Sequence, residues 1–149
     1  MPRYVNQPEL YACGPTVVIN ALKWAGAPAT LKHDFSDIAE MCEYDPDEGS
    51  TDKAIDETLR FLLCGYAKVR KPRYASVRDI RKHVEKGGAC VVTISDWVDM
   101  CHVFLVTGHT GKLYVTHNYN HHRNTTLLRE CTLREYLVGS QNWLLTKEN

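Results

Sequence analysis

The order of helical and strand-like patterns predicts an α+β fold. Residues 13–86 hold mostly helix-period apolar patterns, whereas residues 89–146 hold short apolar runs rich in β-branched residues. Helices that come first and strands that follow are typical of α+β proteins, so we expect a helical N-terminal part on a C-terminal antiparallel sheet, with the helices on one side. The chain has 149 residues, 44% of them hydrophobic. This is enough apolar surface for one domain spanning residues 1–149.

The first helix is predicted from an apolar face that follows Cys13. The apolar residues recur at the spacing of one buried helix face: Val17, Val18, Ala21, Leu22 and Ala25. Gly26 is typical of a helix end. Cys13 therefore lies at a helix N-terminus, where main-chain N–H groups and the helix dipole favour a thiolate. Gln7 lies six positions upstream, and its side-chain amide is expected to donate a hydrogen bond to an oxyanion.

Three further helices are predicted from capping residues and apolar faces. They begin at Asp34 or Ser36, at Ser50 or Thr51, and at Ser76, whose partner in a capping arrangement is Asp79. They end near Cys42, Gly65 and Gly87. A turn-rich acidic loop, 45–50, and the loop 95–100 are expected to border a cleft. The basic segment 66–74 is expected to be an exposed edge strand rather than a phosphate-binding surface.

The second half is predicted to form the sheet. The expected strands are Ala89–Ile94, Val103–Val106, Lys112–Thr116, Thr125–Glu130 and Asn142–Thr146. A short helix precedes the last strand, with Thr132 and Glu135 as its capping pair.

The hairpin around Gly108 predicts which side chains meet. We expect a three-residue loop, 109–111, that ends in glycine. This register opposes three pairs: Val106 with Tyr114, Phe104 with Thr116, and His102 with Asn118. Opposed side chains share a face at about 4.5–5.5 Å between Cβ atoms, so the Asn118 amide would bond the His102 imidazole. His117 would point to the other face.

The spacing of these residues carries a resemblance. The chain has Gln-(five residues)-Cys-Gly-Pro before a helix, His102 within CHVFLVTG, and a later strand that ends at Asn118. In this it resembles the papain-like cysteine peptidase superfamily, most closely the double-glycine (bacteriocin-processing) peptidases and their stand-alone relatives. The resemblance covers most of the chain, because the helix start at 48–51 and the closing strands fall in the family's order.

The resemblance and the residues together imply nucleophilic acyl transfer. His102 would take the proton of Cys13, and Asn118 would fix the tautomer of the imidazole. Gln7 and the Cys13 N–H would hold the oxyanion, and water would release the acyl group. Gly14 and Trp97 are expected to contact the substrate, a peptide or protein. This chemistry needs no cofactor and no metal ion.

The sequence departs from the double-glycine peptidases at one site residue. Those enzymes usually carry Asp, commonly followed by Pro, where this chain has Asn118-Tyr119; Asn is the residue of papain. Asp96 and Asp99 are alternative partners for His102. Transporter-linked members carry membrane and nucleotide-binding domains, and this chain carries neither, so cleavage of a Gly-Gly leader is not the default expectation.

Three alternatives stay open. Zinc binding is suggested by a group of imidazoles and one thiol: Cys101, His102, His109, His117, His121 and His122. Their spacing matches no structural zinc pattern, and strand alternation separates Cys101 and His117 from His102. A second alternative is a non-catalytic peptide-binding module on the same fold. The third is a deamidase or acyltransferase that uses the same residues.

Charge and cysteine usage limit the partners and the compartment. The formal net charge is zero, which gives no electrostatic reason to expect nucleic acid or an anionic membrane. The first ten residues show no signal-peptide pattern, and no apolar run approaches the roughly 20 residues of a membrane span. With six scattered cysteines and no export signal, we expect reduced thiols in the cytoplasm. The sequence gives no oligomeric state.

Overall fold

The chain folds around a single antiparallel sheet of six strands in the order β1-β6-β2-β3-β4-β5. The computed structural model describes residues 2–28, 33–95, 101–120, 123–137 and 141–148. The strands are β1 (Ala67–Arg70), β2 (Ala89–Ser95), β3 (Cys101–Thr110), β4 (Leu113–His117), β5 (Thr126–Arg129) and β6 (Asn142–Lys147). The basic segment forms β1 at one edge of the sheet, so the expected edge strand is confirmed.

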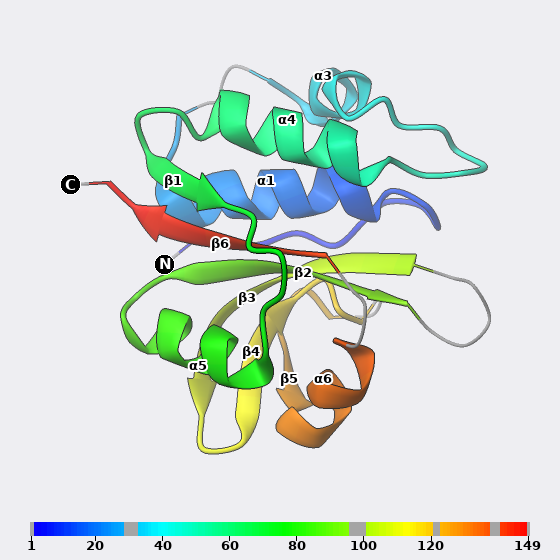
Figure 1. Cartoon of the computed structure of the whole chain (residues 1–149). Helices are drawn as coiled ribbons and strands as arrows, with labels where there is room; N and C mark the ends of the chain where they lie inside the picture. The colour runs from blue at the N-terminus through cyan, green and yellow to red at the C-terminus, as the bar shows by residue number, and fades with distance from the viewer. Residues whose placement is uncertain (1, 29–32, 96–100, 121–122, 138–140, 149) are drawn as a thin grey trace.

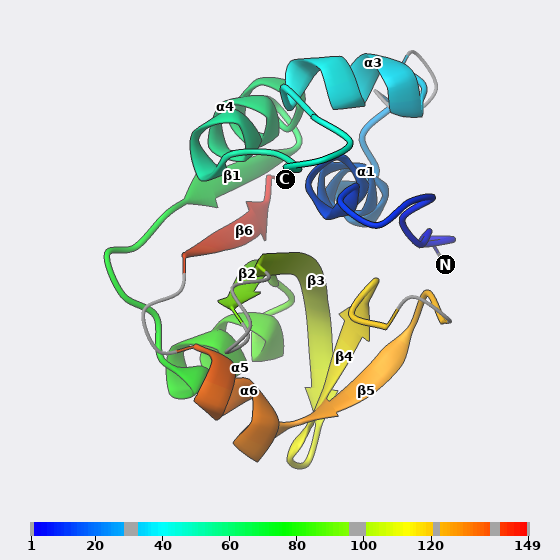
Figure 2. The ribbon, with the colours of Figure 1, turned by 90° about the vertical axis from the view of Figure 1, so that its right-hand side faces the viewer.

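Helices cover both faces of this sheet (Figures 1 and 2). The helices are α1 (Cys13–Ala25), α3 (Phe35–Met41), α4 (Asp52–Leu62), α5 (Val77–Glu85) and α6 (Glu130–Tyr136). The first three lie on one face, and α5 and α6 lie on the other. The α+β class and the antiparallel sheet are confirmed. The expectation that the helices share one side is wrong, because strands that are apolar on both faces need cover on both.

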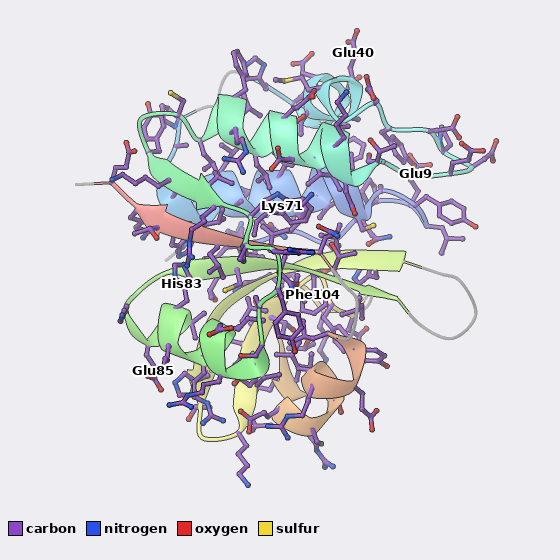
Figure 3. The ribbon with its side chains drawn as sticks, viewed as in Figure 1. Glu9, Glu40, Lys71, His83, Glu85 and Phe104 are labelled. Atoms are coloured by element: carbon purple, nitrogen blue, oxygen red, sulfur yellow. The ribbon has the colours of Figure 1, made fainter. Side chains whose placement is uncertain are left out.

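Strand alternation assigns each apolar residue of the central strands to one of two cores. Val91 and Val103 belong to the core under α1, α3 and α4. Val92 and Phe104 belong to the core under α5 and α6. Phe104 is seen on the α5–α6 side in Figure 3. Each face of β2 and β3 is therefore fixed by its own apolar cluster.

Local capping chemistry set most helix boundaries as predicted. Asp34, Thr51 and Ser76 are N-caps whose side chains accept a hydrogen bond from a main-chain N–H of the first turn. Gly26, in the left-handed region at φ 72°, ends α1. The cap predicted at Thr132 is wrong, because α6 starts at Glu130, directly after β5. There the strand, and not a cap, decides where the helix begins.

In the part of the chain that the structure describes, no helix combines the length and apolar character required to cross a bilayer.

Candidate active site

Cys13 is the first residue of α1, as the sequence predicted. The preceding Ala12 has no side chain that can cap the helix, and the first turn, Cys-Gly-Pro-Thr, contains no carboxylate. Thr16 bonds back to the Ala12 carbonyl through both its N–H and its hydroxyl, at 3.2 and 2.7 Å. The positive end of the α1 dipole therefore acts on Cys13 without an acidic side chain of the first turn to offset it.

The described thiols differ in how easily they ionise. Burial raises the pKa of Cys42 to about 11 and also raises the pKa of the fully buried Cys90. Cys64 and Cys131 are exposed, and Cys13 is half-buried. A thiolate at neutral pH is thus strongly disfavoured at Cys42 and Cys90, and the helix start singles out Cys13 among the other three.

The acidic loop packs against the start of α1, as expected of a loop that borders the site. Gly14 is buried, and a Cβ placed on it would lie 2.8 Å from both Cβ and Oγ of Ser50. Gly49, at φ +83°, brings the loop against the main chain of Tyr11, where an added Cβ would lie 3.3 Å from the carbonyl oxygen. Gly14 therefore allows close contact between the loop and the helix. Its contact with substrate stays a prediction.

His102 is the second residue of β3, and its ring is held from two sides. Its Nε2 lies 2.6 Å from the main-chain oxygen of Asn118, and the ring stacks on Phe104 at 5.8 Å between centroids. Phe104 in turn makes an edge contact with Tyr119 at 5.2 Å. Because a carbonyl can only accept, Nε2 must carry the hydrogen, and a neutral His102 then has its lone pair on Nδ1.

Asn118 connects His102 to the N-terminal arm. Its side chain exchanges two hydrogen bonds with Gln7: the Gln7 N–H donates to Oδ1, and Nδ2 donates to the Gln7 Oε1, both at 2.9 Å. Asn118 is 1% exposed and adopts φ 66°, a conformation that Asn tolerates better than most residues. His102 Nε2 thus donates to the main-chain carbonyl of Asn118, whereas the prediction assigned this hydrogen bond to the side-chain amide.

Gln7 is buried, and its amide hydrogens already have acceptors. Nε2 donates to the carbonyl of Glu9 at 3.0 Å and to that of Leu10 at 2.7 Å. An amide nitrogen has two hydrogens, so both are used within the turn that leads to Cys13. The predicted bond from Gln7 to an oxyanion would require one of these two bonds to open.

The predicted hairpin register is wrong, although it joined two residues that do interact. The strands continue to Thr110 and Leu113, so the loop is shorter than predicted, and a bulge lies between Val106 and Gly108. The pairs are Val106 with Thr116, Gly108 with Val115, His109 with Tyr114 and Thr110 with Leu113. A bulge shifts all pairs on one of its sides. His102 reaches Asn118 because the chain turns after His117 and presents a carbonyl.

His117 lies on the other face, as predicted. It is 3% exposed, its Nε2 and Nδ1 lie 2.7 and 3.1 Å from the hydroxyls of Thr107 and Thr125, and its ring stacks on Tyr4 at 3.7 Å. Burial lowers the pKa of His117 to about 4. It is therefore a neutral structural histidine near pH 7.

Several predicted residues lie outside what the structure describes. These are Trp97, Asp96, Asp99, His121 and His122, together with the Cys101 side chain and the rest of the loop 96–100. Within the described residues, no three metal-ligating side chains come together. His109, from the zinc alternative, pairs instead with Glu85 at 3.0 Å.

The ends of the elements that carry these residues face the same way. The N-terminal end of α1 and the N-terminal end of β3 both lie at the right-hand side of the molecule in Figure 1, and Figure 2 looks onto that side. The N-terminal segment that contains Gln7 is hydrogen-bonded to the side chain of Asn118, directly after β4.

Sequence reasoning missed one supporting residue, Phe104, and one main-chain group, the carbonyl of Asn118. Phe104 could have been found, because it lies two positions after His102 on the same strand and must share its face. The carbonyl of Asn118 leaves no signal in the sequence, because every residue has a main-chain carbonyl.

No family model matches the sequence, and a search of curated proteins gives no match. Solved structures do match. The peptidase domain of Streptococcus ComA, a bi-functional ABC transporter involved in a quorum-sensing pathway, has a TM-score of 0.75 at 16% identity, over 97% of this chain and 99% of that chain. A double glycine motif protease from an AMS/PCAT transporter, in complex with the leader peptide, has a TM-score of 0.67 at 15% identity, over 98% and 92%.

The peptidase domain of ComA from Streptococcus mutans has a TM-score of 0.62 at 13% identity, over 95% of this chain and 97% of that chain. At such low identity a match over nearly the full length of both chains establishes the fold. The chain therefore has the papain-like fold of the double-glycine peptidase domains, which its sequence pattern resembles.

Proposed function

We propose that this chain is a cysteine peptidase-like hydrolase of peptide or amide bonds, acting as one domain with Cys13 as the nucleophile and His102 as the base. The observation that carries the proposal is the hydrogen bond from His102 Nε2 to the Asn118 carbonyl. It leaves the lone pair of the neutral imidazole on Nδ1, and this nitrogen is the proposed base. The shared orientation of the α1 and β3 ends supports the pairing of this nitrogen with Cys13.

The reaction begins when the Cys13 thiol gives its proton to Nδ1 of His102. The thiolate attacks the carbonyl carbon of the substrate and forms a tetrahedral oxyanion. Collapse breaks the C–N bond, and the imidazolium returns the proton to the leaving amine. Water, deprotonated by the same nitrogen, then hydrolyses the thioester and restores the thiol.

The Asn118 carbonyl supplies the orientation in this scheme. The C=O dipole fixes the ring and favours an imidazolium through a charge-assisted bond. It stabilises that charge less than a carboxylate would. An Asp carboxylate is therefore not needed to fix the tautomer of His102. This accounts for Asn118 at a position where the double-glycine peptidases usually carry Asp.

Oxyanion stabilisation is proposed to come from the Cys13 N–H and from Gln7. The Gln7 amide bonds the carbonyls of Glu9 and Leu10, so one of these bonds must be exchanged for the oxyanion. Asn118 keeps the Gln7 carbonyl end in place during that exchange. A donor of this kind contributes about 2.7–4 kcal/mol to the transition state.

A peptide is the proposed substrate, since the fold is shared with a protease solved with its leader peptide. Trp97 and Gly14 are proposed contacts, and the cytoplasm remains the predicted location. The deamidase and acyltransferase alternatives use the same attack on a carbonyl, whereas a peptide-binding module would need no reactive thiol.

The proposal is tested by labelling the folded protein with iodoacetamide and mapping the alkylated cysteines by mass spectrometry over time. Cys64 and Cys131 are exposed and serve as internal references. We expect Cys13 to react fastest at pH 7, and to slow in His102→Ala. The matched control is His109→Ala, which removes another β3 histidine that pairs with Glu85 and should leave the Cys13 rate unchanged.

A Cys13 that reacts no faster than the two references would favour a binding module. If Cys13 is alkylated fastest and its rate is the same in His102→Ala, His102 is not its base. A panel of peptide, isopeptide and glutamine side-chain amide substrates, compared with Cys13→Ser, then separates peptidase from deamidase activity.

A further inference from the structure

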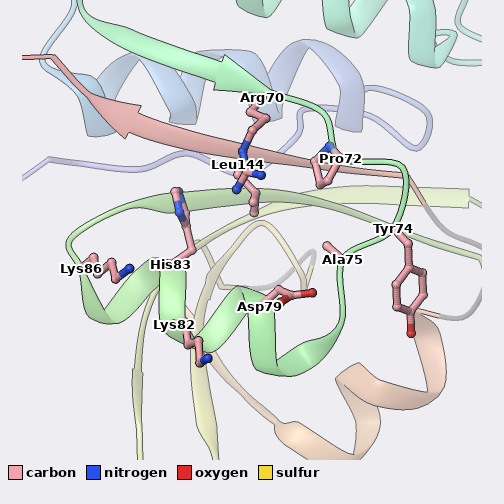
Figure 4. Close-up of a pocket in the computed structure, with 9 residues that line it drawn as sticks. All are labelled: Arg70, Pro72, Tyr74, Ala75, Asp79, Lys82, His83, Lys86 and Leu144. Atoms are coloured by element: carbon pink, nitrogen blue, oxygen red, sulfur yellow. The ribbon is translucent and has the colours of Figure 1, made fainter.

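A polar cavity lies between β1, β6 and α5, formed by residues other than those of the candidate active site. Its volume is about 280 Å³. Its lining includes Arg70 from β1, three residues of or next to α5 (Lys82, His83 and Lys86), and Leu144 from β6 (Figure 4). We call this the basic cavity.

The sheet register explains why Arg70 and Leu144 line the same cavity. Arg70 is paired with Leu144 across β1 and β6, so both side chains point to the α5–α6 face, and Leu144 is part of the core there. Helix α5 packs mainly on β2 and β3. A space is therefore left between α5 and the edge strands. In Figure 4 the Arg70 guanidinium enters it from β1, and the His83 ring enters it from α5.

The charge of the basic cavity is positive in a chain whose formal net charge is zero. It has three permanent cations, Arg70, Lys82 and Lys86, and one carboxylate, Asp79. Asp79 is used locally, because its Oδ2 accepts hydrogen bonds from the Ser76 N–H at 2.9 Å and the Ser76 hydroxyl at 3.0 Å. The cationic side chains of the lining thus outnumber its carboxylates.

One wall of the cavity is rigid. His83 Nε2 lies 2.7 Å from the Leu145 carbonyl and so donates to it. The same ring covers Gly88, where an added Cβ would lie 2.4 Å from Nε2. The ring is therefore held against β6 and the end of α5. A cavity with a fixed wall loses less conformational entropy when it binds a ligand.

We infer that the basic cavity binds a phosphate group, either inorganic phosphate or the phosphate of a small organic molecule. The Arg70 guanidinium from β1 and the Lys86 ammonium from the end of α5 suit a compact multivalent oxyanion. The volume lies near the lower end of ligand pockets, about 300–1,000 Å³, which favours a small anion over a segment of acidic peptide. The site is independent of Cys13, so its failure would leave the proposed hydrolase untouched.

The test is a titration of the ¹⁵N-labelled protein with inorganic phosphate, against sodium chloride at matched ionic strength, followed by amide chemical shifts. We expect saturable shifts at residues 70–71 and 79–88. Affinity should fall by about tenfold or more in Arg70→Gln and in Lys86→Gln. The control is Lys53→Gln, which removes an exposed α4 lysine that pairs with Glu57 and should bind as the wild type does.

A second titration with adenosine monophosphate identifies the source of the phosphate. Tighter binding than that of inorganic phosphate assigns the cavity to an organic phosphate, and equal or weaker binding assigns it to the free ion. Shifts that do not saturate, that chloride reproduces, or that survive in both cavity variants would overturn the inference.

Discussion

Two histidines near Asn118 have opposite surroundings. His102 is half-buried, and its Nε2 donates a hydrogen bond to the Asn118 carbonyl, which fixes the tautomer of the neutral ring with the lone pair on Nδ1. His117 is 3% exposed and lies between two threonine hydroxyls and a stacked tyrosine. The hydroxyls can donate or accept, so they fix neither tautomer.

The difference shows that residue type does not decide the role of an imidazole. Burial lowers the pKa of His117 to about 4, which keeps it neutral and inert near pH 7 and makes it part of the packing between β4 and the N-terminal arm. His102 lies near the start of β3 and is half-buried, and its proposed role is that of a base. The predictions below separate these two roles.

The largest expected effect is the opposite response of the two histidines to replacement. His102→Ala should lower hydrolysis by about 10²- to 10⁴-fold, because it removes the proposed base, with little change in stability. His117→Ala should leave the alkylation rate of Cys13 nearly unchanged and destabilise the fold by about 1–3 kcal/mol, because the buried ring loses its packing on Tyr4 and its hydrogen bonds to Thr107 and Thr125. Peptide hydrolysis and urea unfolding of both variants measure this. Equal losses of activity in the two folded variants would contradict it.

Gln7→Ala should have the next largest effect, a loss of about 10²- to 10³-fold in kcat. The same variant should react with iodoacetamide at nearly the wild-type rate, because alkylation of a thiolate forms no oxyanion. Gln7→Glu, which keeps the size of the side chain and removes the donor, is the matched control and should lose a similar factor in kcat. If alkylation falls together with hydrolysis, Gln7 acts on Cys13 itself rather than on the oxyanion.

Acid should destabilise the fold through His117. Its folded pKa of about 4 lies below the unfolded value near 6.5, so between these values the unfolded chain binds more protons. Stability is then full above about pH 6.5 and falls as the pH drops towards 4, by up to about 3 kcal/mol. Urea unfolding at several pH values checks this against His117→Gln, which does not titrate. Parallel curves for the two proteins would show that His117 does not carry the acid response.

The smallest expected effect is that of Asn118→Gly on thiol reactivity. Glycine accepts φ 66° and keeps the carbonyl that holds His102, but it loses both side-chain bonds to Gln7. We expect a loss of about 1–2 kcal/mol in stability and a Cys13 alkylation rate within about threefold of wild type. Asn118→Ala loses the same side-chain bonds but must also adopt φ 66°, so its difference from Asn118→Gly measures the backbone strain. If the Cys13 alkylation rate falls strongly in Asn118→Gly, the Asn118 side chain and not its carbonyl orients the His102 ring.

The helix starts were predictable from the sequence because caps act over three residues. Asp34, Thr51 and Ser76 bond to the main chain of their own first turn, whatever the rest of the chain does. Cys13 was found at the start of α1 by the apolar period that follows it, since Ala12 provides no side-chain cap. The start of α6 was missed, because β5 runs directly into that helix and its first residue is set by the sheet.

The hairpin illustrates the limit of local reasoning. A glycine after a turn-like pair predicts a loop, yet whether the ladder contains a bulge depends on how β3 and β4 pack against both cores. The shorter loop, which pairs Thr110 with Leu113, changed every predicted pair next to the turn, and the bulge shifts the pairs beyond it once more. His102 and Asn118 interact nonetheless, through a carbonyl that no residue pattern could indicate.

The sequence by itself determined the class of fold and the helix that starts at Cys13, because periodicity is a short-range property of the chain. Only the tertiary structure decided that Asn118 holds His102 by its main chain and Gln7 by its side chain. It also decided that Arg70 meets α5 over one cavity. Those contacts join residues far apart in the sequence, and their geometry follows from strand register and packing rather than from any local preference.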